Sequence, residues 1–183
     1  GRASGAPAAR VENNVGTLHR RGRVTPEGGR TAVDEEVRMI KRPRIKHALS
    51  KGGGATRHNN LIMVTSALPG VGKTFCAINL AMSIAMEMDH TVLLVDADVA
   101  RTSVPRYLGI EAAEGLLDVL LNDKLDLSNV MLRTNCDTPR TLHAGQPHQK
   151  STELLGHLSR HTRPGDIRPH RPPHHLPPCS AAL

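Results

Sequence analysis

A glycine-containing loop around residue 70 has the spacing of a phosphate-binding loop. Gly72-Lys73-Thr74 follows Ala67, which takes the place of the first Gly in the G-x-x-x-x-G-K-[ST] pattern. Backbone N–H groups of such a loop bind phosphate, Lys73 would reach the β- and γ-phosphates, and the Thr74 hydroxyl would ligate Mg²⁺. The residues expected to contact the nucleotide are Pro69, Gly70, Val71, Gly72, Lys73, Thr74 and Phe75. The alternative is a glycine-rich turn in which Gly-Lys-Thr occurs by chance.

A pair of carboxylates follows the next apolar segment. Asp96 and Asp98 come directly after Thr91–Val95, at the end of a predicted strand. In parallel sheets ligands bind beyond the carboxyl ends of the strands, and oxygen ligands suit Mg²⁺. The pattern therefore predicts Asp96 and Asp98, with Thr74, as metal ligands, and Arg101 as a charge-stabilising residue near phosphate. The alternative is an Asp-rich turn that caps the following helix.

The elements around these residues predict an α/β fold. Residues 61–66 are a short apolar run typical of a strand buried on both faces, residues 75–86 favour a deeply buried helix, and residues 91–95 predict a second strand. Strand, glycine loop, helix and strand form a βαβ unit. We expect a P-loop NTPase with a parallel sheet and flanking helices, incomplete on its C-terminal side.

The chain divides into four regions by composition. Residues 1–30 predict a disordered basic arm, and residues 31–60 a helix, interrupted at Pro43, with a Gly-rich linker. Residues 61–159 predict a partial P-loop ATPase or kinase domain. Residues 160–183 contain six Pro, four His and four Arg, so we expect an irregular tail, because proline lacks the N–H that strands and helices need.

Composition excludes several classes of protein. The net charge of +7 belongs to the ends: residues 1–60 hold 13 Lys and Arg against 5 Asp and Glu, whereas residues 61–159 hold 7 against 11. Phe75 and Tyr107 are the aromatic residues, too few for a base-stacking surface, so nucleic acid is not an expected partner. Three widely spaced cysteines favour neither disulfides nor zinc. No apolar run reaches the ~20 residues of a membrane span, and no secretory signal is recognised, so we expect a cytoplasmic protein.

The loop and the Asp pair resemble the bacterial tyrosine kinases of exopolysaccharide biosynthesis, in particular the exosortase-associated tyrosine autokinases. Residues 60–74 look like their Walker A segment, and residues 93–98 with Arg101 look like their second, Walker A′ motif. Glu35-x-x-Arg38-x-x-Lys41 is similar to the ExxRxxR element through which subunits of that family associate. The resemblance covers roughly residues 31–159.

The resemblance implies ATP binding with Mg²⁺ and phosphoryl transfer to tyrosine. It also implies self-association through residues 31–49, a membrane polysaccharide-export partner, and a place at the inner face of the plasma membrane. Val71 stands where that family usually has Glu, and the chain lacks both the Asp-x-Pro-Pro motif that would supply the Walker B carboxylate and a tyrosine cluster. We therefore expect this chain by itself to be a weak or inactive kinase.

Two other interpretations stay open. A ParA/MinD-like ATPase shares the βαβ unit, but its loop begins Lys-Gly-Gly where this chain has Leu68, Pro69 and Gly70. A non-catalytic nucleotide-binding remnant is the other. The abrupt change of composition near Arg160 leads us to expect a truncated or frameshifted reading frame after about residue 159. Resequencing the gene tests that expectation.

Overall fold

The fold is described from a computed structural model. The residues that it describes are 10–11, 31–49, 61–87, 91–110, 114–122, 125–134, 140–145, 151, 153 and 178–182.

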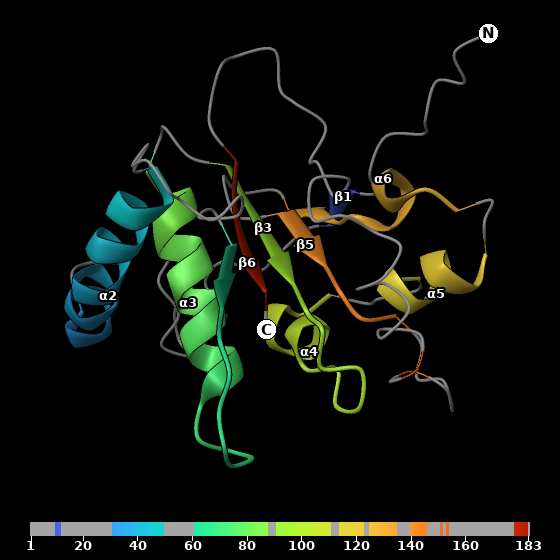
Figure 1. The fold of residues 1–183 in the computed structure, drawn as a ribbon, viewed down its shortest axis with the longest axis horizontal. Helices are drawn as coiled ribbons and strands as arrows, with labels where there is room; N and C mark the ends of the chain where they lie inside the picture. Colours follow the sequence, from blue (N-terminus) through green and yellow to red (C-terminus); the bar gives the residue numbers. More distant parts are fainter. Residues whose placement is uncertain are drawn as a thin grey trace, which may run out of the picture.

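A four-stranded parallel sheet forms the centre of the molecule (Figure 1). Its strands, in spatial order, are β2 (Leu61–Met63), β6 (Pro178–Ala182), β3 (Thr91–Val95) and β5 (Arg140–Leu142). Met63, Ala182, Val95 and Leu142 lie side by side in the register. The carboxyl ends of all four strands therefore meet at one edge. The predicted α/β class with a parallel sheet is confirmed.

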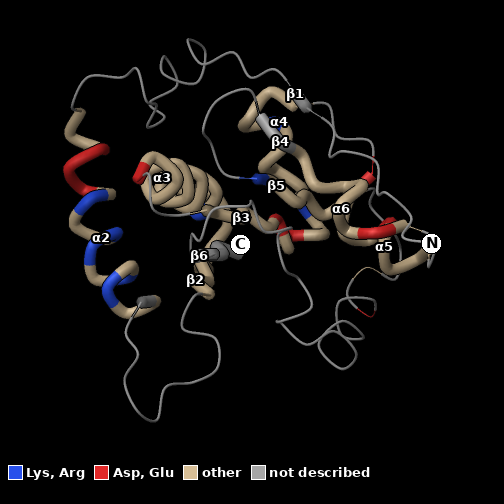
Figure 2. The backbone as a smooth tube through the Cα atoms, turned by 90° about the horizontal axis from the view of Figure 1, so that it is seen from above, with Lys and Arg blue, Asp and Glu red and all other residues tan. Residues whose placement is uncertain are grey.

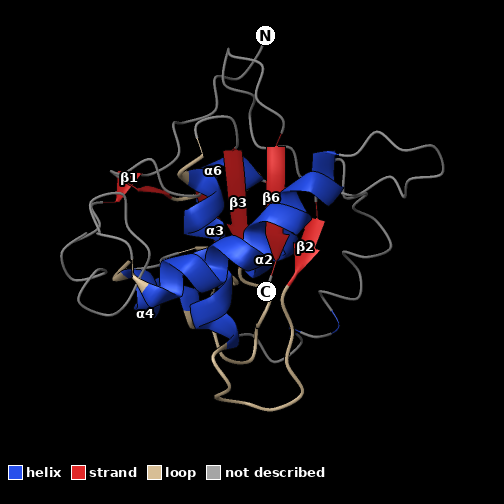
Figure 3. Ribbon diagram, turned by 90° about the vertical axis from the view of Figure 1, so that its left-hand side faces the viewer, coloured by secondary structure: helices blue, strands red, loops and turns tan. Residues whose placement is uncertain are grey.

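Two helices cover one face of this sheet in successive layers (Figure 3). α3 (Lys73–Ala85) packs against β3, and α2 (Ala32–Leu49) packs against the outer side of α3. Eight consecutive residues of α3, Ala77 to Ile84, are buried, as its continuous apolar sequence predicted. Figure 2 shows the contrast between this nearly uncharged helix and α2, which is acidic at its start and basic along its remaining length.

The core lies on both faces of β3 because successive side chains of a strand point to opposite faces. Val92 and Leu94 pack in the cluster that contains α3, whereas Leu93 packs in a second cluster with Leu116 and Leu142. Three short helices complete the described part of the fold: α4 (Val104–Leu108), α5 (Leu116–Leu121) and α6 (Leu127–Val130). No helix of the described residues is long and apolar enough to cross a membrane.

The prediction that Pro43 interrupts the first helix was wrong. α2 continues through Pro43 to Leu49. Proline in a helix interior costs ~3 kcal/mol, but residues four apart hold α2 on α3 along its whole length. These are Val33, Val37, Lys41 and Ile45. Packing of this face outweighs the local cost of an exposed proline.

The predictions for both ends of the chain also need correction. Within the expected irregular tail, Pro178–Ala182 forms β6, which pairs with both β2 and β3. Proline is tolerated at the first residue of a strand, and the four residues after Pro178 contain none. Within the expected disordered arm, β1 (Arg10–Val11) pairs with β4 (Arg133–Thr134). The other residues of 1–30 and of 160–183 lie outside the described residues.

Candidate functional site: a phosphate-binding loop facing two carboxylates

The predicted phosphate-binding loop connects β2 to the start of α3. Gly70 and Gly72 have φ of +79° and +93°, a backbone conformation that side chains strain, so the loop needs glycine at both positions. A Cβ added at either glycine would meet no atom within 4 Å. The space beside the loop backbone is therefore open. Pro69 and Val71 are exposed on the loop, and Phe75 lies half-buried in the first turn of α3.

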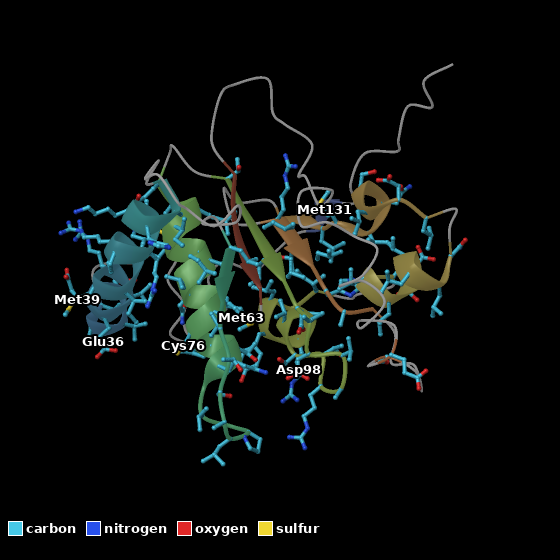
Figure 4. The ribbon with its side chains drawn as sticks, viewed as in Figure 1. Glu36, Met39, Met63, Cys76, Asp98 and Met131 are labelled. Atoms are coloured by element: carbon cyan, nitrogen blue, oxygen red, sulfur yellow. The ribbon has the colours of Figure 1, made fainter. Side chains whose placement is uncertain are left out.

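Lys73 is the first residue of α3 and pairs with the second strand. Its Nζ lies 2.8 Å from Asp98 Oδ2, and the two side chains are 25% and 30% exposed. Hydrogen bonding from Lys73 holds the pKa of Asp98 below its usual value. The other oxygen of Asp98 accepts a hydrogen bond from the backbone N–H of Arg101 at 3.2 Å. Asp98 is labelled in Figure 4, at the edge of the sheet where β3 ends.

Asp96 is completely buried and is held by backbone N–H groups. Oδ1 accepts from the N–H of Asp98 at 3.1 Å, and Oδ2 accepts from those of Ser103 and Val104 at 3.2 Å each. Burial raises the pKa of this carboxyl group. The predicted alternative role therefore has support: Asp96 does anchor the start of α4. Its role as a metal ligand stays a prediction.

The hydroxyl of Thr74 has a partner that the sequence analysis missed. Thr74 Oγ1 lies 2.9 Å from Ser103 Oγ, so Ser103 joins the loop to the segment after β3. Positions 74 and 103 lie in different elements, and no local pattern connects them. A serine directly before a short helix such as α4 would ordinarily indicate a helix cap.

The structure thus brings four of the predicted site residues together, whereas the fifth, Arg101, does not place its side chain among them. Lys73 and Thr74 from the loop side face Asp96 and Asp98 from the β3 side. Arg101 is exposed, and the contact that it makes here is through its backbone N–H. Its guanidinium makes no ion pair within the described part of the chain.

The donor set suits a nucleotide with a hard metal ion. No group of three or more His, Cys, Asp or Glu that could hold a metal exists among the described residues. Mg²⁺ needs no such group, because proteins usually bind it through one or two carboxylates together with substrate phosphates and water. One hydroxyl, two carboxylates, a lysine and an open glycine backbone fit that arrangement.

His143 lies beside this site, but its side chain is hydrogen-bonded to the backbone and not to the loop or the aspartates. It is buried directly after β5, and its Nδ1 accepts a hydrogen bond from the backbone N–H of Gly145 at 3.1 Å. Burial lowers the pKa of this imidazole. The neighbouring strands are tied here by a hydrogen bond from the Asp96 N–H to the carbonyl oxygen of Leu142 at 2.9 Å. These contacts fix the strand ends, and the predicted metal ligands stay Thr74, Asp96 and Asp98.

Comparison with known proteins agrees with this geometry. A family model described as "ParA: NUBPL iron-transfer P-loop NTPase" matches residues 57–131. The chain is 33% identical over 121 residues to the tyrosine-protein kinase ptk of Acinetobacter johnsonii, covering 66% of this chain and 15% of that one. It is 32% identical over 145 residues to the tyrosine-protein kinase YwqD of Bacillus subtilis, covering 79% of this chain and 58% of that one.

Solved structures agree on the fold. The kinase domain of the Escherichia coli tyrosine kinase ETK superposes with a TM-score of 0.62 at 23% identity, covering 97% of this chain and 69% of that one. The loop, the paired aspartates and these similarities together identify a P-loop NTPase domain that is homologous to part of the bacterial tyrosine kinases.

Proposed function

We propose that this chain binds ATP with Mg²⁺ at the loop between β2 and α3. The observation that carries the proposal is the position of Lys73, held 2.8 Å from Asp98 beside a glycine backbone with open space next to it. A lysine in a partly exposed pair can exchange its carboxylate for phosphate oxygens, because solvent reaches both side chains and screens their attraction.

Each residue has a distinct task in this proposal. The loop N–H groups and the N-terminus of α3 bind phosphate oxygens. Lys73 supplies a point charge at the β- and γ-phosphates, while Thr74, Asp96 and Asp98 provide the oxygens that hold the metal. When bound, Mg²⁺ neutralises charge on the phosphates. The backbone N–H groups on Asp96 keep its carboxylate fixed before the ion arrives.

For the whole protein we propose transfer of the γ-phosphoryl group of ATP to tyrosine. The relatives named above are tyrosine kinases, and the chain spans 15% of the length of one and 58% of the other. Two further parts of this proposal rest on the same likeness: self-association through α2 and a membrane polysaccharide-export partner at the inner face of the plasma membrane. On α2, Glu35 and Arg38 form an exposed pair at 3.8 Å, available to a partner.

Replacing Lys73 with Met tests nucleotide binding. Lys73→Met keeps the bulk of the side chain and removes its charge, so we expect at least a tenfold loss of ATP affinity, the effect of a charged hydrogen bond. Calorimetric titration with Mg-ATP measures it. Lys46→Met, which removes an exposed lysine of α2, is the matched control and should bind like the wild type. Equal affinity of wild type and Lys73→Met would overturn the proposal.

Phosphotyrosine formation separates the kinase from other ATPases. We expect weak autophosphorylation of this chain, because it lacks the Asp-x-Pro-Pro motif and a tyrosine cluster. Incubation with labelled ATP, followed by phosphotyrosine detection in wild type and Tyr107→Phe, measures it. Strong labelling that Tyr107→Phe removes would contradict this expectation. ATP hydrolysis without phosphotyrosine would favour a ParA-like ATPase, the second candidate, which the family match over residues 57–131 supports.

A further inference from the structure

We propose that Ser103 is a positioning residue of the magnesium site, where it orients the Thr74 hydroxyl and connects it to Asp96. This inference rests on the proposed function, since it concerns how the same site holds its metal ion. Ser103 is outside the glycine loop and outside the Asp pair, and it has no charge of its own.

Two hydrogen bonds place Ser103 between candidate ligands from different elements. Its Oγ lies 2.9 Å from Thr74 Oγ1, and its backbone N–H donates to Asp96 Oδ2 at 3.2 Å. Asp96 and Ser103 are buried and half-buried, respectively. A single residue thus bridges the helix that follows the loop and the carboxylate that follows β3.

The use of the Ser103 hydroxyl is unusual for its position. Ser103 is the N-cap residue of α4, where a serine oxygen ordinarily accepts an N–H from the first turn. Here the side chain makes no capping hydrogen bond. Asp96 takes that task by accepting the N–H groups of Ser103 and Val104. The hydroxyl is therefore left free to face the loop, where it meets Thr74.

Metal binding would determine which hydroxyl donates in the hydrogen bond between Thr74 and Ser103. Of the two hydroxyls of Thr74 and Ser103, either can be the donor in the contact that the structure shows. A hydroxyl that ligates a cation turns a lone pair toward it and must donate its hydrogen elsewhere. Ser103 Oγ is the acceptor within reach, so it orients the Thr74 oxygen toward the ion. Without that acceptor, Thr74 keeps its hydroxyl but loses the orientation suited to Mg²⁺.

Removing the serine hydroxyl tests the inference. For Ser103→Ala we expect ATP affinity to fall roughly three- to tenfold with Mg²⁺ present, the effect of one hydrogen bond. In EDTA its ATP affinity should equal that of the wild type. Thr102→Val removes the hydroxyl of the neighbouring residue and should change neither value. Calorimetric titration of ATP in both conditions, with a thermal melt of each variant, provides the measurements.

A second pair of variants keeps the inference testable if Ser103→Ala does not fold. Thr and Val have nearly the same shape, so Ser103→Thr and Ser103→Val differ only by the hydroxyl. We expect Ser103→Thr to retain the affinity gain from Mg²⁺ and Ser103→Val to lose most of it. Equal Mg²⁺ dependence of these two variants would overturn the role of Ser103, as would equal losses in Mg²⁺ and EDTA. Failure of the wild type to bind ATP would instead overturn the proposed function.

Discussion

The two ends of α3 each carry a lysine ion pair, and the two pairs differ in kind. At the C-terminal end, Lys41 of α2 places Nζ 2.9 Å from the carbonyl oxygen of Ser83 and 2.9 Å from Glu87 Oε1. At the N-terminal end, Lys73 pairs with Asp98 at 2.8 Å. The Lys41 side chain is 9% exposed and that of Lys73 is 25% exposed.

Helix polarity explains why the Lys41 pair stabilises the packing of α2 on α3, whereas Lys73 is proposed to exchange its carboxylate partner for phosphate. The last carbonyl groups of a helix carry partial negative charge, so a cation there is favoured and satisfies an acceptor that the helix leaves unpaired. The first N–H groups carry partial positive charge, so Lys73 gains nothing from the helix itself. Its site attracts anions instead. Similar ion pairs thus serve stability at one end of α3 and, in the proposed function, ligand binding at the other.

The largest effect that tests this contrast is expected for Lys41→Met. This variant leaves the Ser83 carbonyl and Glu87 without their cation, so we expect the free energy of unfolding to fall by about 1–3 kcal/mol. Urea denaturation measures it. Lys73→Met is the matched variant at the other end, and its unfolding free energy should change by less than about 1 kcal/mol. Equal destabilisation by the two variants would remove the distinction between the ends.

A smaller effect is expected for Asp98→Asn, which releases Lys73 from its resting partner. In EDTA we expect ATP to bind roughly two- to fivefold tighter than to the wild type, the strength of a partly exposed pair. Glu36→Gln, an exposed change on α2 that Figure 4 shows on its outer side, is the control for lost negative charge. The gain should vanish when Asp98→Asn is combined with Lys73→Met. A gain that survives in the double variant would mean that Lys73 is not the group released.

The smallest expected effect is the pH dependence of the Lys73–Asp98 pair. The pKa of Asp98 is lower in the folded protein than its ordinary 3.8. The pair therefore stabilises the fold above about pH 3.8 and loses this contribution as pH falls through the folded value. We expect the free energy of unfolding of the wild type to exceed that of Asp98→Asn by less than about 1 kcal/mol at pH 6, and this difference to shrink toward pH 3. Urea denaturation at each pH measures it. A difference that grows on acidification would show the opposite sign.

Local sequence was sufficient to predict the loop and the strand that carries the aspartates. The residues from Gly70 to Thr74 are contiguous, and their backbone conformation depends mainly on glycine at two positions. After Thr91 the strand consists of apolar residues up to Val95, and its three central residues are buried, as expected of a strand covered on both faces. The parallel arrangement then follows from the short βαβ unit, because a strand, helix and strand in sequence return the chain in the same direction.

Contacts between distant residues could not be predicted in this way. From its local sequence, Lys41 is indistinguishable from the solvated lysines of α2. Its partner Ser83 lies 42 residues away in sequence, and only the packing of α2 on α3 brings the two together. Ser103 and Thr74 are separated by 29 residues. Pro43 and Pro178 were interpreted by their local cost, whereas helix packing in the first case and strand pairing in the second decided the outcome.

The place of β6 in the sheet has a consequence for how the molecule assembles. β2 and β3 do not pair with each other, since β6 lies between them and bonds to both. The backbone hydrogen bonds of residues 61–63 in the sheet can therefore form only when residues 180–182 are in place. Closing so long a stretch of chain is entropically costly and slows folding relative to a sheet of adjacent strands. During synthesis, the half of the sheet next to the glycine loop can therefore form only after residues 178–182 have been made.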